Sequence, residues 1–149
     1  MRFTLMRIFV VIGMIALMLG ILRMLTHAET GRGVASVDWL PATASNVSYY
    51  KSYLNTAYEF DISEANFVRW SRWKLQPITT PVEFLRCTYF LRDPSDSGLS
   101  PTVSEAIDLS HIVQISNGLF YEERQPNGGG VEVAFDRDTG RAYFHSSPR

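Results

Sequence analysis

The sequence predicts a protein of the α+β class: an N-terminal transmembrane helix or signal segment, then a mostly antiparallel sheet with one packed helix and a C-terminal β-meander. Three observations lead to this prediction. Residues 8–22 contain no charged or strongly polar side chain. A helical pattern follows an alternating strand near residue 60, and three strand patterns close the chain. We expect a signal anchor or signal peptide (1–28), a linker (29–39) and a single α+β domain (40–149).

The apolar run has the length of a short membrane segment. At 1.5 Å per residue, residues 8–22 cover roughly 22 Å, less than the ~30 Å hydrocarbon core of a bilayer. Arg23 interrupts the run, and Met24 and Leu25 resume it. If the Arg23 side chain snorkels to the interface, residues 8–25 form a span of roughly 27 Å. We therefore expect contact with a lipid bilayer through residues 8–25.

Two interpretations of this segment stay open. Cleavage near Ala28 would release a secreted or periplasmic domain, because a small residue suits the position before a signal-peptide cut. Arg23 lies between the apolar core and that site, which favours an uncleaved anchor. Arg2 and Arg7 precede the run and favour a cytoplasmic N-terminus, with the domain on the extracytoplasmic side.

The composition bounds the rest of the chain. It is 46% hydrophobic and 13% aromatic, enough to form a packed core. From residue 34 onward, about 10 basic and 14 acidic side chains give a net charge of about −4. A domain of this charge lacks the basic surface that neutralises phosphates, so nucleic acid is not an expected partner.

Two strands and a helix are expected to open the domain. Residues 47–52 alternate like a strand, and in residues 56–62 Tyr58 and Phe60 point to one face while Glu59 points to the other. This is the pattern of a half-buried antiparallel strand. Either Asp61 or Ser63 is suited to cap a following helix.

The helix is expected to run on to Pro77. At 100° per residue, Phe67, Val68, Ser71 and Leu75 share the face that would meet the core. Trp70 lies at the edge of this face, and Trp73 lies nearly opposite it, beside Asn66 and Arg69.

The C-terminal half is expected to be rich in strands. Residues 81–91, apolar on both faces, predict a central strand, and residues 92–102 predict a loop. Residues 104–116 are ambiguous but end like a strand, and Asn117-Gly118 indicates a tight turn. The meander strands are expected at 119–124, 131–135 and 141–145.

Several short motifs resemble a group of bacterial proteins. They are Leu40-Pro41-x-x-Ala44-x-x-Val47, then Tyr58-Glu59-Phe60-Asp61-Ile62-Ser63-Glu64-x-x-Phe67, then Gly128-Gly129-Gly130 with Asp136-x-x-Thr139-Gly140-Arg141-Ala142-Tyr143-Phe144. Together they are similar to an uncharacterised family of small exported or membrane-anchored bacterial proteins. The resemblance covers most of residues 40–145. It implies an exported α+β domain and assigns no catalytic residue.

Two glycine-containing motifs are expected to be turns. Gly128-Gly129-Gly130 precedes a strand and has no nearby lysine, so it lacks the helix and the lysine of a phosphate-binding loop. Asp136-x-Asp138-x-Gly140 resembles the start of a calcium loop, but it lacks the further acidic ligands that such a loop requires. We assign no metal site and no cofactor.

The sequence supports no catalytic assignment. The chain has one cysteine, Cys87, in an apolar run, so we expect a buried thiol and no internal disulfide. A nucleophile, base and orienter composed of Cys87, His111 and Asp108 can be imagined, but nothing local supports it. The three histidines are too scattered to indicate zinc.

A cluster of aromatic and basic residues is the strongest candidate for an interaction surface. It contains Trp70, Trp73, Arg69 and Arg72. Such residues on a helix can contact lipid headgroups or a protein partner. The plainer alternative is that the tryptophans simply pack in the fold.

We therefore expect a membrane-tethered, extracytoplasmic accessory or binding domain that is non-enzymatic and has an envelope protein as its partner. Two alternatives stay open. One is a small secreted or periplasmic enzyme of hydrolase type whose site forms only in the fold. The other is a structural component of an envelope complex.

Overall fold

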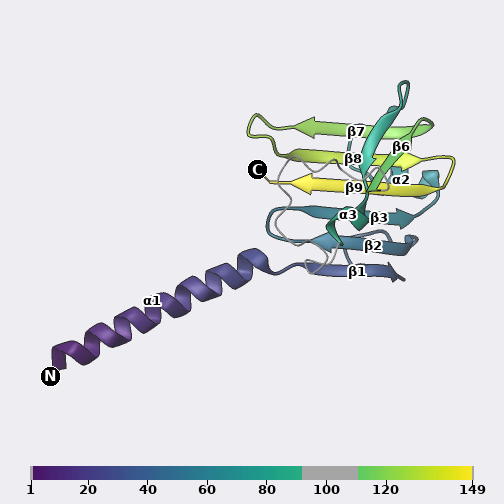
Figure 1. The fold of residues 1–149 in the computed structure, drawn as a ribbon. Helices are drawn as coiled ribbons and strands as arrows, with labels where there is room; N and C mark the ends of the chain where they lie inside the picture. The colour runs from purple at the N-terminus through teal and green to yellow at the C-terminus, as the bar shows by residue number, and fades with distance from the viewer. Residues whose placement is uncertain (1, 92–110, 149) are drawn as a thin grey trace.

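A computed structural model describes residues 2–91 and 111–148 of the chain, and its centre is a seven-stranded sheet. The strands of this sheet are β1 (Glu29–Val34), β2 (Ser45–Lys51), β3 (Thr56–Asp61), β4 (Gln76–Pro77), β7 (Gly118–Arg124), β8 (Gly130–Asp136) and β9 (Arg141–Ser147). Their spatial order is β1-β2-β3-β9-β8-β7-β4, and the pairings are antiparallel. Figure 1 shows this sheet with helices and a small second sheet around it. The expected α+β class with a sheet-rich body is confirmed.

The C-terminal meander forms as expected and meets β3 at the centre of the sheet. β7, β8 and β9 follow one another through two hairpins. β9 then pairs with β3, so Tyr58 lies opposite Phe144 and Glu59 lies opposite Tyr143. Side chains that are paired between β3 and β9, and between β9 and β8, therefore lie on the same face of the sheet.

The sheet is covered on both faces, which corrects one expectation. One face carries the larger core, in which Phe60, Phe67 and Phe135 are buried. The opposite face carries a smaller core around Phe84 and Tyr143. Glu59 was expected to face solvent, but only 2% of it is exposed because the second layer covers its side of β3.

The helix after β3 is shorter than expected. α2 (Glu64–Trp70) begins after Ser63, whose hydroxyl accepts a hydrogen bond from the N–H of Asn66 at 3.4 Å. This confirms Ser63 as the N-cap. The helix ends at Trp70 because Ser71 has extended backbone angles.

The early end of α2 relocates Trp73. Trp73 lies outside the helix and packs, half-buried, against the larger core, so its placement on the outer helix face was wrong. Val68, expected on the core face, is 50% exposed. Ser71, Trp73 and Leu75 lie beyond the seven helical residues, so the 100° periodicity does not apply to them.

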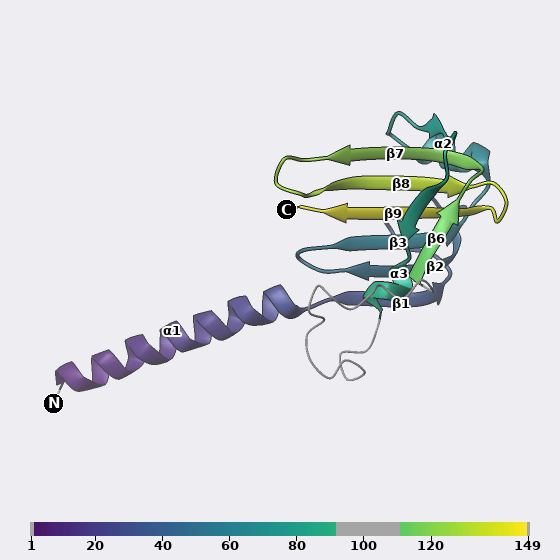
Figure 2. The ribbon, with the colours of Figure 1, turned by 45° about the horizontal axis from the view of Figure 1, so that its top comes forward.

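Residues 81–91 do not form a central strand. They divide into β5 (Val82–Leu85) and α3 (Cys87–Phe90), and β5 pairs with β6 (Ile112–Ile115) in a separate two-stranded sheet. β6 confirms the strand expected at the end of residues 104–116. The expected loop at 92–102 and the start of the ambiguous segment lie outside the described residues. Figures 1 and 2 show β5, β6 and α3 crossing one face of the large sheet.

Part of the expected linker belongs to the sheet. Within residues 29–39, β1 pairs with β2 and places Gly31 opposite Tyr49. A Cβ atom at Gly31 would collide with the Tyr49 ring, so any larger residue here would displace that side chain. The sheet therefore begins directly at Glu29.

α1 (Arg2–Thr26) is a helix of 25 residues that extends away from the sheet (Figure 1). The large apolar side chains between Phe9 and Leu22 are each 49–72% exposed. Among the described residues, no helix meets the combined length and apolarity of a membrane span.

Candidate binding sites at an aromatic pocket and at the sheet edge

An aromatic pocket forms on the face of the sheet that carries α2. Its lining residues are Trp39, Trp70, Arg72 and Trp73, and its volume is about 240 Å³. Trp39 comes from the segment between β1 and β2, and the other three come from the end of α2 and the residues after it. Three of the four residues predicted as an interaction surface thus meet in one pocket, while Arg69 is exposed on α2 and is not among its lining residues.

The tryptophan rings of the pocket are held by packing. The Trp39 ring stacks on Tyr58 with centroids 4.9 Å apart and an interplanar angle of 27°. It meets Trp70 edge to face at 5.2 Å and 86°. Trp70 in turn meets Trp73 at 5.6 Å and 68°. Stacked and edge-to-face pairs of this kind stabilise ring positions, so the aromatic part of the pocket is preformed.

Arg72 is the charged group of the aromatic pocket. Its guanidinium carbon lies 5.5 Å from the centroid of the Trp73 ring, within the range of a cation–π contact. Among the residues that the structure describes, no carboxylate forms an ion pair with Arg72. The pocket therefore presents a positive charge beside aromatic rings.

Sequence reasoning missed Trp39. It belongs to no periodic pattern, and 31 positions separate it from Trp70. In the fold, the Trp39 ring packs on Tyr58 of β3 and on Phe144 of β9, and these contacts bring it beside Trp70.

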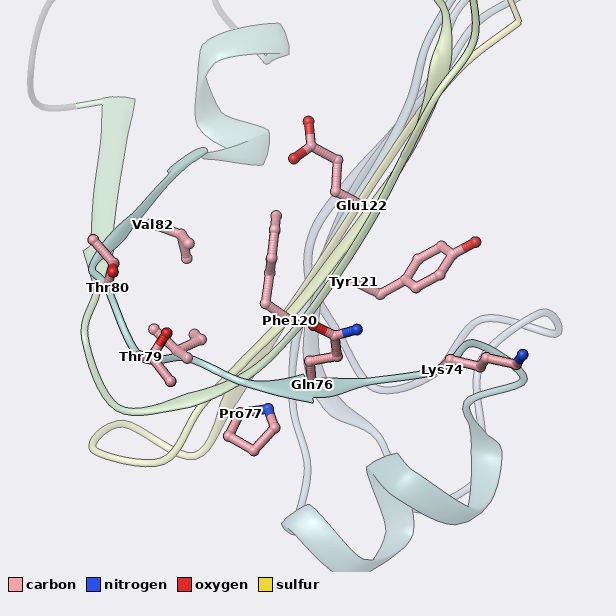
Figure 3. A pocket seen from close by; sticks show the side chains of 10 residues that line it. Lys74, Gln76, Pro77, Thr79, Thr80, Val82, Phe120, Tyr121 and Glu122 are labelled. Carbon is pink, nitrogen blue, oxygen red and sulfur yellow. The ribbon is translucent and has the colours of Figure 1, made fainter.

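A larger cleft lies on the other face of the sheet, at its β4–β7 edge. Its volume is about 490 Å³. Figure 3 shows Phe120 and Glu122 rising from β7 into this hollow, with Val82 of β5 on the facing wall. The other lining residues come from the edge strand and its flanks: Lys74, Gln76, Pro77, Ile78, Thr79, Thr80 and Tyr121. The cleft combines an apolar floor with a carboxylate.

The edge of β7 beside this cleft is only partly covered. β4 pairs with Leu119 and Phe120 and extends no further. The Gly118 carbonyl accepts a hydrogen bond from the Ile78 N–H, so it points toward the β4 side. The Gln125 N–H donates to the Gly129 carbonyl, so it points toward β8. Because backbone groups alternate in direction along a strand, those of Glu122 and Arg124 point away from β8. Within the described parts of the chain, no strand neighbours them there.

Charged residues line the same face next to the cleft. Arg124 donates hydrogen bonds to Glu122 and, at 3.2 Å, to Glu132. The Nδ1 atom of His145 lies 3.9 Å from the Glu132 carboxylate. The adjacent His145 side chain and the positive charge of Arg124 hold the pKa of Glu132 below its usual range. Glu132 is therefore ionised at neutral pH and cannot serve as a general acid.

An ionic cluster around the buried Glu59 joins α3 to the large sheet. The Glu59 carboxylate accepts a hydrogen bond from the backbone N–H of Cys87 and lies 3.6 Å from Arg86 and 3.4 Å from Arg141. Arg141 also contacts Asp61 at 2.6 Å. A buried carboxylate with this many partners orders the strands and helix around it.

The imagined catalytic group does not assemble among the described residues. Cys87 is 1% exposed, and its thiol donates toward the Ala57 carbonyl at 3.7 Å. The Nδ1 atom of His111 lies 3.3 Å from the Thr88 hydroxyl. Burial, with a contribution from the Glu59 charge, raises the pKa of Cys87 to about 12. The thiolate is therefore negligible at neutral pH, and Asp108 lies outside the described residues.

The two glycine-containing motifs are turns, as expected. Gly128 has a φ of 85° in the β7–β8 hairpin, and Gly140 has a φ of 67° in the β8–β9 hairpin. The Asp136 carboxylate accepts hydrogen bonds from the Asp138 N–H and the Thr139 hydroxyl. In the described residues, histidine, cysteine, aspartate and glutamate side chains form no group suited to a metal ion.

The fold and these sites define the chain as an α+β domain that carries a 25-residue N-terminal helix and two preformed hollows. No known protein family, curated protein or solved structure matches the chain. The resemblance noted in the sequence therefore gains no support.

Proposed function

We propose that the protein is a membrane-tethered binding domain that faces an extracytoplasmic space. The observation that carries this proposal is the exposure of α1. Consecutive residues such as Phe9, Val10, Val11 and Ile12 are each about half or more exposed, so apolar side chains surround the whole helix. A helix that is apolar on all sides is unfavourable in water and favourable in lipid.

The short junction between α1 and the sheet supports a position of the domain beside the bilayer. α1 ends at Thr26 and β1 begins at Glu29, so only His27 and Ala28 separate them. In the anchored form, the sheet would lie at the membrane surface with little freedom to reach away from it. Cleavage after Ala28 would instead leave every strand in the released product.

The edge of β7 is our proposed surface for a protein partner. An extended segment can pair with the outward-facing backbone groups of Glu122 and Arg124 while its side chains enter the cleft. Phe120 favours an apolar side chain in that segment. Binding at this edge needs no catalytic residue, which agrees with the burial of Cys87.

Flotation with lipid vesicles tests the membrane tether. The full chain is expected to float with phospholipid vesicles, and Leu17→Asp is expected to reduce its partition by about 100-fold. A charge at the centre of an inserted helix costs about 2.5–3.5 kcal/mol, and a tenfold change corresponds to about 1.4 kcal/mol.

Val68→Asp is the matched control for flotation. Val68 is 50% exposed on α2, so this variant adds the same charge at an exposed apolar site of the domain. Its flotation should equal that of the unmodified chain. The tether is contradicted if the unmodified chain, Leu17→Asp and Val68→Asp all float equally. It is also contradicted if none of the three floats, because α1 then does not insert.

A further inference from the structure

We propose that the aromatic pocket binds an acidic sugar, a single pyranose ring that bears a carboxylate. The pocket holds about 240 Å³, which is smaller than the 300–1,000 Å³ typical of drug-sized sites. A ligand of about one ring fits this space. The inference names a ligand for the binding role proposed above, but it does not depend on insertion of α1 into a membrane.

The tryptophan rings suit the apolar face of a sugar. One face of Trp39 rests on Tyr58, and 36% of Trp39 remains exposed. Trp70 stands nearly perpendicular to Trp39, so the two rings form a corner instead of a parallel slot. A pyranose ring, with C–H bonds on its faces and hydroxyls around its rim, can pack into a corner.

Arg72 selects for a negative charge on that sugar. Its guanidinium has no carboxylate partner among the described residues and lies over the Trp73 ring. A guanidinium recognises a carboxylate through two parallel hydrogen bonds, which a neutral sugar cannot offer. The same positive charge disfavours a cationic ligand.

The position of the pocket favours such a ligand over a lipid headgroup. Figures 1 and 2 both show α2, which carries Trp70, at the end of the sheet remote from α1. A membrane that holds α1 would therefore lie on the far side of the domain from this pocket.

Intrinsic fluorescence gives a local measurement, because the three tryptophans of the chain all line the pocket. The full chain in neutral detergent micelles is titrated with glucuronate, glucose and benzoate at constant ionic strength. Glucuronate is expected to produce a saturable change, with glucose binding at least about tenfold more weakly, as expected for loss of a charge-assisted hydrogen bond.

Two variants of equal charge separate the role of Arg72 from general electrostatics. Arg72→Gln is expected to bind glucuronate no better than glucose. Arg69→Gln, changed on the exposed side of α2, should keep the preference for glucuronate. The proposal is overturned if glucuronate gives no saturable change, if benzoate binds more tightly than glucuronate, or if both variants behave alike.

Discussion

Glu59 is the residue that departs furthest from its sequence pattern. The alternation of β3 predicted a solvent-facing carboxylate, because a period of two marks only which face a residue takes. It cannot show that α3, some 30 positions later, covers that face. Arg86 and Arg141 were visible in the sequence as charges, but their meeting at Glu59 depends on the β3–β9 pairing and on the start of α3.

Glu59→Gln is expected to destabilise the domain by about 1.5–3 kcal/mol, because a neutral amide accepts weaker hydrogen bonds from the Cys87 N–H and from Arg141 than the buried carboxylate does. Urea unfolding monitored by circular dichroism measures the loss. Glu64→Gln is the matched control, since Glu64 also pairs with an arginine, Arg137 at 2.6 Å, but is 39% exposed. Its cost should be under about 1 kcal/mol. Similar costs for the two variants would show that Glu59 is not buried in an ionic cluster.

The pKa of Cys87 predicts how stability changes with pH. Its folded pKa of about 12 exceeds the ordinary value of 9.0. Between these values the unfolded chain loses the thiol proton while the folded chain keeps it, so stability falls as pH rises above 9. In Cys87→Ala, the free energy of unfolding should fall less steeply between pH 9 and 11. An unchanged slope would mean that the thiol titrates normally in the fold.

Gly118 is the first residue of β7, the strand of the large sheet that follows β6 of the second sheet in the chain. A Cβ atom at this position would lie 1.8 Å from the Phe135 carbonyl oxygen, which belongs to the neighbouring strand and cannot move aside. Gly118→Ala should therefore destabilise the domain by about 2 kcal/mol or more, as overpacking does. Differential scanning calorimetry would show a lower Tm, whereas Gly13→Ala, with nothing within 4 Å, should leave the domain transition unchanged.

At the scale of elements, local sequence patterns predicted the strands of the meander. They did not predict features that depend on packing against distant parts of the chain. The β-meander was predictable because short hairpins place successive strands side by side. The length of α2 was not, because Ser71 leaves the helix and Trp73 turns back to the core. The sequence predicted a central strand at residues 81–91 because this segment is apolar on both faces. Such a pattern suits a covered strand and a short buried helix equally.

The open part of β7 allows a test with proline. Glu122→Pro should cost about 1 kcal/mol or less, because its N–H points away from β8 and bonds to no strand among the described residues. Glu123→Pro should cost about 3 kcal/mol, because it removes a ladder hydrogen bond to β8. Chemical denaturation of both variants measures the difference. The reverse order would contradict the assigned direction of these backbone groups.

At the scale of the whole molecule, the domain is expected to be independent of α1. The core residues lie between Leu40 and Phe144, and α1 contributes none of them among its described side chains. The division into an apolar segment and a domain was predictable because it depends on composition. The aromatic pocket was only partly predictable, because Trp39 joins it through the fold.

The measurement that tests the membrane tether most directly is the intact mass of the protein in membrane and soluble fractions of its native host. We predict the mass of the full 149 residues, found in the membrane fraction and released by detergent but not by high salt. A shorter mass beginning near Glu29, found in the soluble fraction, would contradict the tether and show that the domain is released.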